Sequence, residues 1–260
     1  MRAVEIFQLT GPATATRVVD LPDPTSEDSV VVEVKAAGVS FPEVLQTRGE
    51  YQYKPELPFV PGSEVGGVVR SAPADSGFAP GDRVAAFSMT GGFAELVVAP
   101  AAMTFALPDR LDFAQGAALI LNYHTAYFAL VTRGRLKAGE TVLIHGAAGG
   151  VGTATIQVAN GLGARTIAVV SSDDKAAVAK AAGASDVVRS DGPWKDEVLA
   201  LTGGVGIDVV IDTVGGDRFT DSLRSLARTG RLVVVGFTGG AIPEVKVNRL
   251  LLRNTEVIGA

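Results

Sequence analysis

The chain of 260 residues is long enough for two ordinary domains, and its 47% hydrophobic and 20% charged residues exclude an intrinsically disordered protein. A formal net charge of −5, without any run of Lys and Arg, argues against a nucleic-acid-binding surface. Because the chain has no cysteine, it can form neither disulfides nor thiolate metal sites. No apolar run approaches the roughly 18 residues of a membrane span, and the first residues lack a secretory signal core. We therefore expect a cytoplasmic protein with neither nucleic-acid nor membrane partners.

The N-terminal part, residues 1–120, shows short β-like runs separated by proline and glycine. The predicted strands cover Val30–Val34, Val65–Val69, Arg83–Phe87 and Phe93–Val98. Strands at this spacing indicate a small, mostly antiparallel β-barrel or sandwich. The segment Asp112–Thr132 then has a helical pattern, and we expect this helix to link the two halves of the chain.

The C-terminal part, residues 121–260, changes to an alternation of strands and helices. The predicted strands cover Thr141–His145, Thr166–Val170, Asp186–Val188, Asp208–Ile211, Leu232–Gly236 and Glu256–Ile258. The predicted helices cover Val151–Leu162, Asp173–Ala182, Lys195–Leu201, Arg218–Leu226 and Val247–Arg253, with helix-stopping glycines expected at Gly183 and Gly230. Such alternation implies right-handed crossovers. The sequence thus predicts an α/β fold with a doubly wound parallel sheet of the Rossmann type.

A glycine-rich turn follows the first of these strands. The segment Thr141–Gly152 places an apolar strand before Gly146-Ala-Ala-Gly-Gly-Val-Gly, and a helix follows. A turn of this kind lets a pyrophosphate approach without a Cβ in the way and presents free N–H groups at the helix N-terminus. The strand–turn–helix context favours a dinucleotide site over a glycine-rich turn without a ligand.

The end of the second strand indicates which dinucleotide binds. Domains specific for NAD place an acidic residue there, whereas this chain has Val170. Asp173 and Asp174 come later, and we expect them to cap the next helix. Two serine hydroxyls and Lys175 could bind a 2′-phosphate, which predicts NADP(H). The alternative is that Lys175 is an ordinary solvated helix residue.

Several motifs resemble those of one oxidoreductase superfamily. They are Ala37-Gly38-Val39, Lys54–Gly67, Gly81–Val84, Gly91–Glu95, Ala147–Gly152, Asp208–Gly216 and Gly230–Leu232. Over essentially its whole length the chain resembles zinc-independent medium-chain dehydrogenases/reductases, closest to the zeta-crystallin-like NADPH:quinone oxidoreductases. The resemblance implies a mostly β, GroES-like substrate domain at 1–120 and a Rossmann NADPH-binding domain at 121–260.

The same resemblance bears on zinc. Zinc-bearing relatives usually carry Gly-His-Glu where this chain has Gly62-Ser63-Glu64, and they use cysteines that it lacks. With only His124 and His145, neither a catalytic nor a structural zinc site can be built, and we expect no metal. The substrate carbonyl must then be polarised by hydrogen bonds or proton donors.

The resemblance also implies site residues, with the cofactor in a cleft between the two halves. Contacts to the cofactor are expected from Ser40, Asn122, Thr125, Gly149, Gly150, Val151, Ser171, Ser172, Lys175, Ser190, Thr213, Gly236 and Phe237, with Asn248 as a weaker candidate. Ser40 stands where the family often has Asn, and Ser190 stands near a position where several relatives have Tyr. Tyr51 matches a tyrosine that lines the substrate pocket and is the candidate catalytic proton donor; its alternative is a tyrosine packed on a loop.

Three other polar or aromatic residues have plainer interpretations. We expect His145 to be a buried histidine satisfied by backbone groups, and Asp212 to brace the turn after its strand. Trp194 is expected to be a packing or surface residue.

The predicted reaction is hydride transfer from NADPH to a quinone or a similar conjugated carbonyl. The alternatives are an enone or enoyl-thioester reductase, and an NADPH-binding protein without turnover. Family members usually continue past the last Rossmann strand to finish the first domain, whereas this chain stops at Ala260, so we expect one wall of the substrate pocket to be missing. Because relatives commonly pair at the last strand, we expect a homodimer.

Overall fold

The computed structural model describes residues 1–260. The chain forms two compact units, Met1–Leu121 and Asn122–Ala260. None of the helices has the length and apolar content that a membrane crossing requires.

The first unit is built from antiparallel strands. β1 (Arg2–Ile6) pairs with β2 (Thr16–Asp20), and a five-stranded sheet has the order β6-β3-β4-β5-β7. The members of this sheet are β3 (Val30–Ala37), β4 (Glu64–Ser71), β5 (Arg83–Phe87), β6 (Leu96–Ala99) and β7 (Thr104–Ala106). Valines that alternate along these strands, among them Val32, Val69 and Val84, form one buried cluster. The predicted antiparallel β-rich fold is confirmed, although β6 begins at Leu96 rather than Phe93.

Short helices complete this unit. They are α1 (Pro12–Ala15), α2 (Phe41–Gln46), the 3-10 helix η1 (Ala101–Met103) and α3 (Phe113–Ala117). The helical pattern predicted over Asp112–Thr132 is confirmed, with a turn at residues 118–119 that interrupts it. That segment divides into α3, α4 (Ile120–Tyr127) and the π-helix η2 (Phe128–Arg133). α3 begins with a capping box, in which Asp112 and Gln115 bond reciprocally.

The second unit is a six-stranded, fully parallel sheet with the order β10-β9-β8-β11-β12-β13. The strands are β8 (Thr141–His145), β9 (Arg165–Val170), β10 (Asp186–Arg189), β11 (Ile207–Asp212), β12 (Leu226–Val234) and β13 (Glu256–Gly259). The helices are α5 (Gly150–Gly161), α6 (Asp173–Ala181), α7 (Trp194–Leu201), the 3-10 helix η3 (Gly216–Arg218), α8 (Phe219–Ser225) and α9 (Asn248–Arg253). In chain order this is the 3-2-1-4-5-6 arrangement of a Rossmann fold, so the predicted doubly wound sheet is confirmed.

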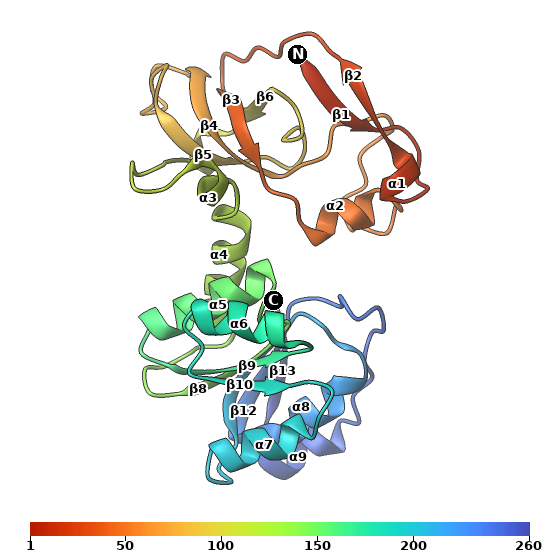
Figure 1. Ribbon diagram of the computed structural model, residues 1–260, viewed down its shortest axis with the longest axis vertical. Coiled ribbons are helices and arrows are strands. Elements are labelled where there is room, and N and C mark those ends of the chain that lie inside the picture. The colour runs from red at the N-terminus through yellow and green to blue at the C-terminus, as the bar shows by residue number, and fades with distance from the viewer. The chain divides into compact units, whose positions relative to one another are not determined.

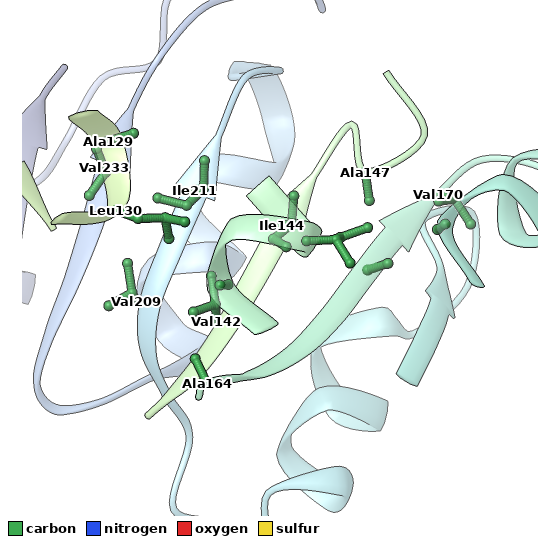
Figure 2. Close-up of a cluster of buried hydrophobic side chains, with 14 residues drawn as sticks. Ala129, Leu130, Val142, Ile144, Ala147, Ala164, Val170, Val209, Ile211 and Val233 are labelled. Atoms are coloured by element: carbon green, nitrogen blue, oxygen red, sulfur yellow. The ribbon is translucent and has the colours of Figure 1, made fainter. Parts of the chain in front are cut away.

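Helices cover both faces of this sheet, because both faces of its strands are apolar. Figure 1 shows α5 and α6 on one face and α7, α8 and α9 on the other. Neighbouring residues of β8 illustrate the alternation: Val142 and Ile144 belong to the core under α5, whereas Leu143 belongs to the core under α7 and α8. Figure 2 shows the first of these cores, where Ile144 and Ile211 lie among the side chains of adjacent strands.

Two features of β12 differ from the expectation. β12 begins at Leu226 rather than Leu232, because Leu226 already pairs with Ile207 of β11. The pairing is then irregular around Thr229, which has a φ of 64°, and resumes with Arg231 opposite Val209. The prediction of a helix stop at Gly230 is wrong, since Gly230 lies inside β12. A Cβ added there would come within 2.8 Å of the Ile207 carbonyl oxygen, so close strand packing requires the glycine.

The strand order reverses between β8 and β11. From β8 the chain proceeds outward to β9 and β10, and from β11 it proceeds in the opposite direction to β12 and β13. In open parallel sheets the ligand crevice lies outside the carboxyl ends of the strands at such a point. We therefore expect the ligand site beside the turns that follow His145, Val170 and Asp212.

Candidate functional site

The turn after β8 is shaped by close backbone contacts. Gly146 has a φ of 63°, and a Cβ on it would lie 2.6 Å from the Thr213 hydroxyl oxygen. The N–H of Gly149 donates to the Gly146 carbonyl at 2.9 Å and closes the turn. A Cβ on Gly152 would lie 2.3 Å from that same carbonyl oxygen. Gly146 is therefore required by its positive φ and its contact with Thr213, and Gly152 by the packing of α5 against the turn.

Gly149 is different, because the fold leaves room around it. Its backbone is extended (φ −80°), and an added Cβ would meet only the Gly146 carbonyl oxygen, at 3.3 Å. As the N-cap of α5 it supplies no side-chain bond, and the first N–H that reaches its carbonyl is that of Thr153, at 2.9 Å. The N–H groups of the three intervening residues thus have no helical partner. They form the positive end of α5, which suits an anion.

Asn122 lies directly against this turn. A Cβ on Gly150 would come within 2.5 Å of the Asn122 amide oxygen, so the amide of α4 covers the first residue of α5. Thr125 stands three residues further along α4, on the same helical face. The structure thus brings Asn122 to the predicted nucleotide turn.

Ser171 and Ser172 follow β9 at the same edge of the sheet. The Ser172 hydroxyl caps α6 by accepting the Lys175 N–H, at 3.4 Å. The Lys175 ammonium donates to the Ser171 hydroxyl at 2.9 Å. The residue at the end of the strand is the buried Val170, which carries no carboxylate. The N–H of Ser190 donates to the Val170 carbonyl at 2.8 Å, which places Ser190 beside this corner.

Arg189, the last residue of β10, was not among the sequence candidates. It pairs in register with Val170, and its guanidinium donates to the Ser171 carbonyl at 3.1 Å. It also forms ion pairs with Asp173 and Asp191. The signal that could have identified it was the parallel register itself, which sets the end of β10 beside the end of β9.

The turns after β11 and β12 brace each other. The Thr213 hydroxyl donates to the His145 carbonyl at 3.1 Å, and the Thr238 hydroxyl donates to the Thr213 carbonyl at 3.0 Å. Gly236 donates to the Asp212 carbonyl, and a Cβ on Gly215 would lie 2.9 Å from the half-exposed ring of Phe237. These residues lie at the predicted edge. Asn248 begins α9 with an exposed side chain and has no hydrogen bond to this edge.

Asp212 and His145 are buried beneath this edge. One Asp212 carboxylate oxygen accepts the N–H groups of Val214 and Gly215, both at 2.9 Å, which confirms that it braces its turn. The partner of His145 is a side chain rather than the expected backbone group: Nε2 lies 2.8 Å from the Ser222 hydroxyl. Burial lowers the pKa of His145 to about 4. Trp194 packs edge-on against the His145 ring, as a buried packing residue.

In the first unit, Ser40 caps α2 through Glu43. The N–H and hydroxyl of Ser40 donate to one Glu43 carboxylate oxygen at 2.8 and 2.7 Å, and the Ser63 hydroxyl donates to the other at 3.1 Å. Ser40 is only partly buried, so its oxygen lone pairs can still accept from a ligand. Tyr51 is half-buried in the segment after α2, and Tyr53 is exposed.

Glu64, at the start of β4, was also not a sequence candidate. One of its carboxylate oxygens accepts the Leu121 N–H at 2.9 Å, and its side chain packs so closely that a Cβ on Gly38 would lie 2.7 Å from its Cγ. Burial, and secondarily the neighbouring Glu43 charge, raise the pKa of Glu64 to about 7. Burial of this kind is set by tertiary packing, which the local sequence does not reveal.

The residues present do not suit a zinc ion. The chain has no cysteine, and His145 is fully buried and bonded to Ser222. No group of three or more His, Asp or Glu side chains is arranged to hold a metal. The Ser63 hydroxyl, where zinc-bearing relatives carry histidine, is already bonded to Glu43.

Comparison with known proteins places this architecture in a family. The family model described as alcohol dehydrogenase GroES-like domain matches residues 26–109, and the one described as zinc-binding dehydrogenase matches residues 150–260. Quinone oxidoreductase-like protein 2 of Rattus norvegicus is 43% identical over 99% of this chain and 74% of its own length.

Solved structures agree with this placement. A probable oxidoreductase from Mycobacterium abscessus is 50% identical, with a TM-score of 0.88, over all of this chain and 79% of its own. The quinone oxidoreductase of Thermus thermophilus, described also in its complex with NADPH, is 36% identical with a TM-score of 0.84, over all of this chain and 80% of its own. The first unit is therefore a GroES-like domain and the second a Rossmann domain. The chain belongs to the medium-chain dehydrogenase/reductase superfamily, among its oxidoreductases of the quinone oxidoreductase type.

Proposed function

We propose that this oxidoreductase transfers a hydride from NADPH to a quinone or a similar conjugated carbonyl, without zinc. The observation that carries the proposal is the turn at Gly149, where an added Cβ would meet only the Gly146 carbonyl oxygen, at 3.3 Å, beside N–H groups at the start of α5 that have no helical partner. Packing explains Gly146 and Gly152 but not Gly149, whereas a diphosphate resting on the turn would explain it.

The 2′-phosphate of NADPH fits the corner after β9. Val170 removes the carboxylate that would repel it, and the Lys175 ammonium is already bonded to the Ser171 hydroxyl. We assign the diphosphate to Gly149, Gly150 and Val151, and the 2′-phosphate to Ser171, Ser172, Lys175 and Ser190. We place Asn122, Thr125, Thr213, Gly236 and Phe237 along the rest of the nucleotide, and Ser40 at its nicotinamide end. A bound nicotinamide would supply the hydride.

The acceptor chemistry follows from the side chains available. With no site for a Lewis acid, the substrate oxygen must be held by hydrogen bonds, and we propose Tyr51 as one donor lining the pocket. A quinone or enone suits such a site, because hydride addition gives a delocalised phenolate or enolate that takes its proton from solvent. The residues therefore bind and orient the reactants rather than form a covalent intermediate. The names of the relatives point to the same substrate class.

A simple assay tests the proposal. The purified protein is mixed with NADPH and 1,4-benzoquinone, an enone or an enoyl thioester, and the absorbance of the reduced nicotinamide is followed. We expect NADPH consumption with the quinone, undiminished by a chelator. Consumption with only the enone or enoyl thioester would move the assignment to that class. Binding of NADPH without consumption by any acceptor would indicate a non-catalytic protein.

We also propose that the protein forms a homodimer through β13. This strand is at the edge of the sheet, and α9 beside it exposes Leu251 and Leu252, at 74% and 80%. Sedimentation at micromolar concentration should give twice the monomer mass. A monomer mass would refute the dimer without affecting the proposed reaction.

A further inference from the structure

Two cationic side chains converge on Ser171 at the carboxyl end of β9. The Lys175 ammonium reaches the Ser171 hydroxyl at 2.9 Å, and an Arg189 guanidinium nitrogen reaches the Ser171 carbonyl oxygen at 3.1 Å. Lys175 comes from α6 and Arg189 from β10, so two separate elements supply the charges. The parallel register that pairs Arg189 with Val170 holds the second cation at this corner.

The partners of Arg189 are carboxylates that lie in water. Asp173 is 95% exposed and Asp191 is 66% exposed, whereas the Arg189 side chain is 37% exposed and its Nε is buried without a partner. Ion pairs with such exposed carboxylates contribute little, because water competes for both charges. The guanidinium is thus held in place by its strand and by Ser171 more than by its counter-ions.

A phosphate is the ligand that would compete best for this guanidinium. The planar fork of arginine matches two phosphate oxygens at once, and a phosphate carries more charge than either carboxylate. A phosphate beside Ser171 would also meet Lys175. Displacement of Asp173 and Asp191 into solvent would leave no buried charge, since both side chains are already exposed.

We propose that Arg189 is a specificity-determining residue for NADPH, exchanging Asp173 and Asp191 for the 2′-phosphate of the adenosine ribose. The inference rests on the proposed function and adds a second cation to that subsite. Ser190, the next residue, offers a short uncharged hydroxyl, and Arg189 adds a charged contact beside it. The competing possibility is that Asp173 accepts the 2′-hydroxyl of NADH, which would make the same corner selective for NAD.

Binding measurements separate these possibilities without requiring turnover. NADPH, NADH, 2′,5′-ADP and 5′-AMP are titrated into the wild-type chain of 260 residues and into its Arg189→Gln, Arg189→Lys and Asp173→Asn variants. Matched controls are Asp174→Asn, which changes the neighbouring exposed carboxylate of α6, and Arg228→Gln, which removes an exposed arginine of the same unit that forms no ion pair.

Because Arg189→Gln removes a charge-assisted contact, it should lower the affinity for NADPH and for 2′,5′-ADP by about ten- to a hundredfold. The affinity for NADH and for 5′-AMP should change less than about twofold. The NADPH affinity of Arg189→Lys should lie between those of the wild type and Arg189→Gln. Asp173→Asn should leave NADPH binding unchanged or tighter, because it removes a competitor for Arg189. The two controls should bind like the wild type.

Two results would overturn the role of Arg189. One is an unchanged ratio of NADPH to NADH affinity in Arg189→Gln, and the other is a selective loss of NADH affinity in Asp173→Asn. If the wild type bound neither NADPH nor NADH, the proposed function would fail together with this inference. These outcomes therefore distinguish a wrong residue from a wrong cofactor.

Discussion

An alanine at Gly152 should lower stability, whereas an alanine at Gly149 should lower NADPH affinity, although both residues belong to one turn. At Gly152 the new Cβ would lie 2.3 Å from the Gly146 carbonyl oxygen and 2.7 Å from backbone atoms of Ala147. Neither neighbour is a flexible side chain, so the helix and the turn must separate. At Gly149 the only neighbour lies at 3.3 Å, and a shift of a few tenths of an ångström relieves the contact.

The expected magnitudes follow from these contacts. For Gly152→Ala, overpacking against the backbone should lower the free energy of unfolding by about 1 to 3 kcal/mol or more. For Gly149→Ala, alanine is a poorer N-cap than glycine, but it restricts the unfolded chain by about 0.4 to 1 kcal/mol. The two effects offset each other, so the free energy of unfolding should stay within about 1 kcal/mol of the wild type.

Nucleotide affinity should respond differently. The methyl group of Gly149→Ala would occupy space beside the N–H groups to which we assign the diphosphate. Each charge-assisted hydrogen bond lost there would cost about 1.5 to 3 kcal/mol of binding free energy. NADPH affinity should therefore fall about ten- to a hundredfold in a variant that is still fully folded. Urea unfolding and fluorescence titration with NADPH measure the two quantities. Wild-type affinity in Gly149→Ala would refute the placement of the diphosphate.

Three further predictions concern pH and metal. Between pH 4.5 and about 7 an unfolded chain releases the Glu64 proton that the folded protein keeps, so Glu64 makes stability fall as pH rises. In urea unfolding, the free energy of unfolding of Glu64→Gln should exceed that of the wild type by roughly 1 to 2 kcal/mol at pH 8 and equal it at pH 4. An equal increase at both pH values would contradict the raised pKa of Glu64. His145 acts in the opposite direction between its folded pKa of about 4 and its unfolded value of 6.5, because only the unfolded chain is protonated there. His145→Gln should reduce the slope of the free energy of unfolding against pH between pH 4 and 6.5. An unaltered slope would contradict the burial of His145 as a neutral ring. Dialysis against EDTA should leave NADPH oxidation unchanged, and activity that zinc alone restores would contradict the zinc-free reaction.

The Rossmann unit could be predicted from sequence because its signals are local. Strand Thr141–His145 has the apolar centre Val142–Ile144 and a glycine-rich turn behind it, and the structure places β8 over the same residues. β12 could not be delimited in this way, because its start depends on a register jump that Thr229 accommodates with a positive φ. The pairing of β1 with β2 was likewise missed, since it depends on contacts between separate segments.

The candidate site shows the same division. Gly149 and its neighbours could be proposed from the sequence because the strand, the glycine-rich turn and the start of the helix are contiguous in it. Arg189 was missed because only the register of β10 against β9 places it beside Val170. Glu64 was missed because its packing against Gly38 is a tertiary contact. Ser40 was predicted by its position alone, and only the folded structure shows that its hydroxyl is bonded to Glu43.

The most direct measurement of the central claim is a crystal structure of the protein with bound NADPH. We expect a diphosphate against the N–H groups that follow Gly149, with the 2′-phosphate beside Ser171 and Lys175. A nucleotide bound elsewhere, or a turn closed over by a side chain, would contradict it.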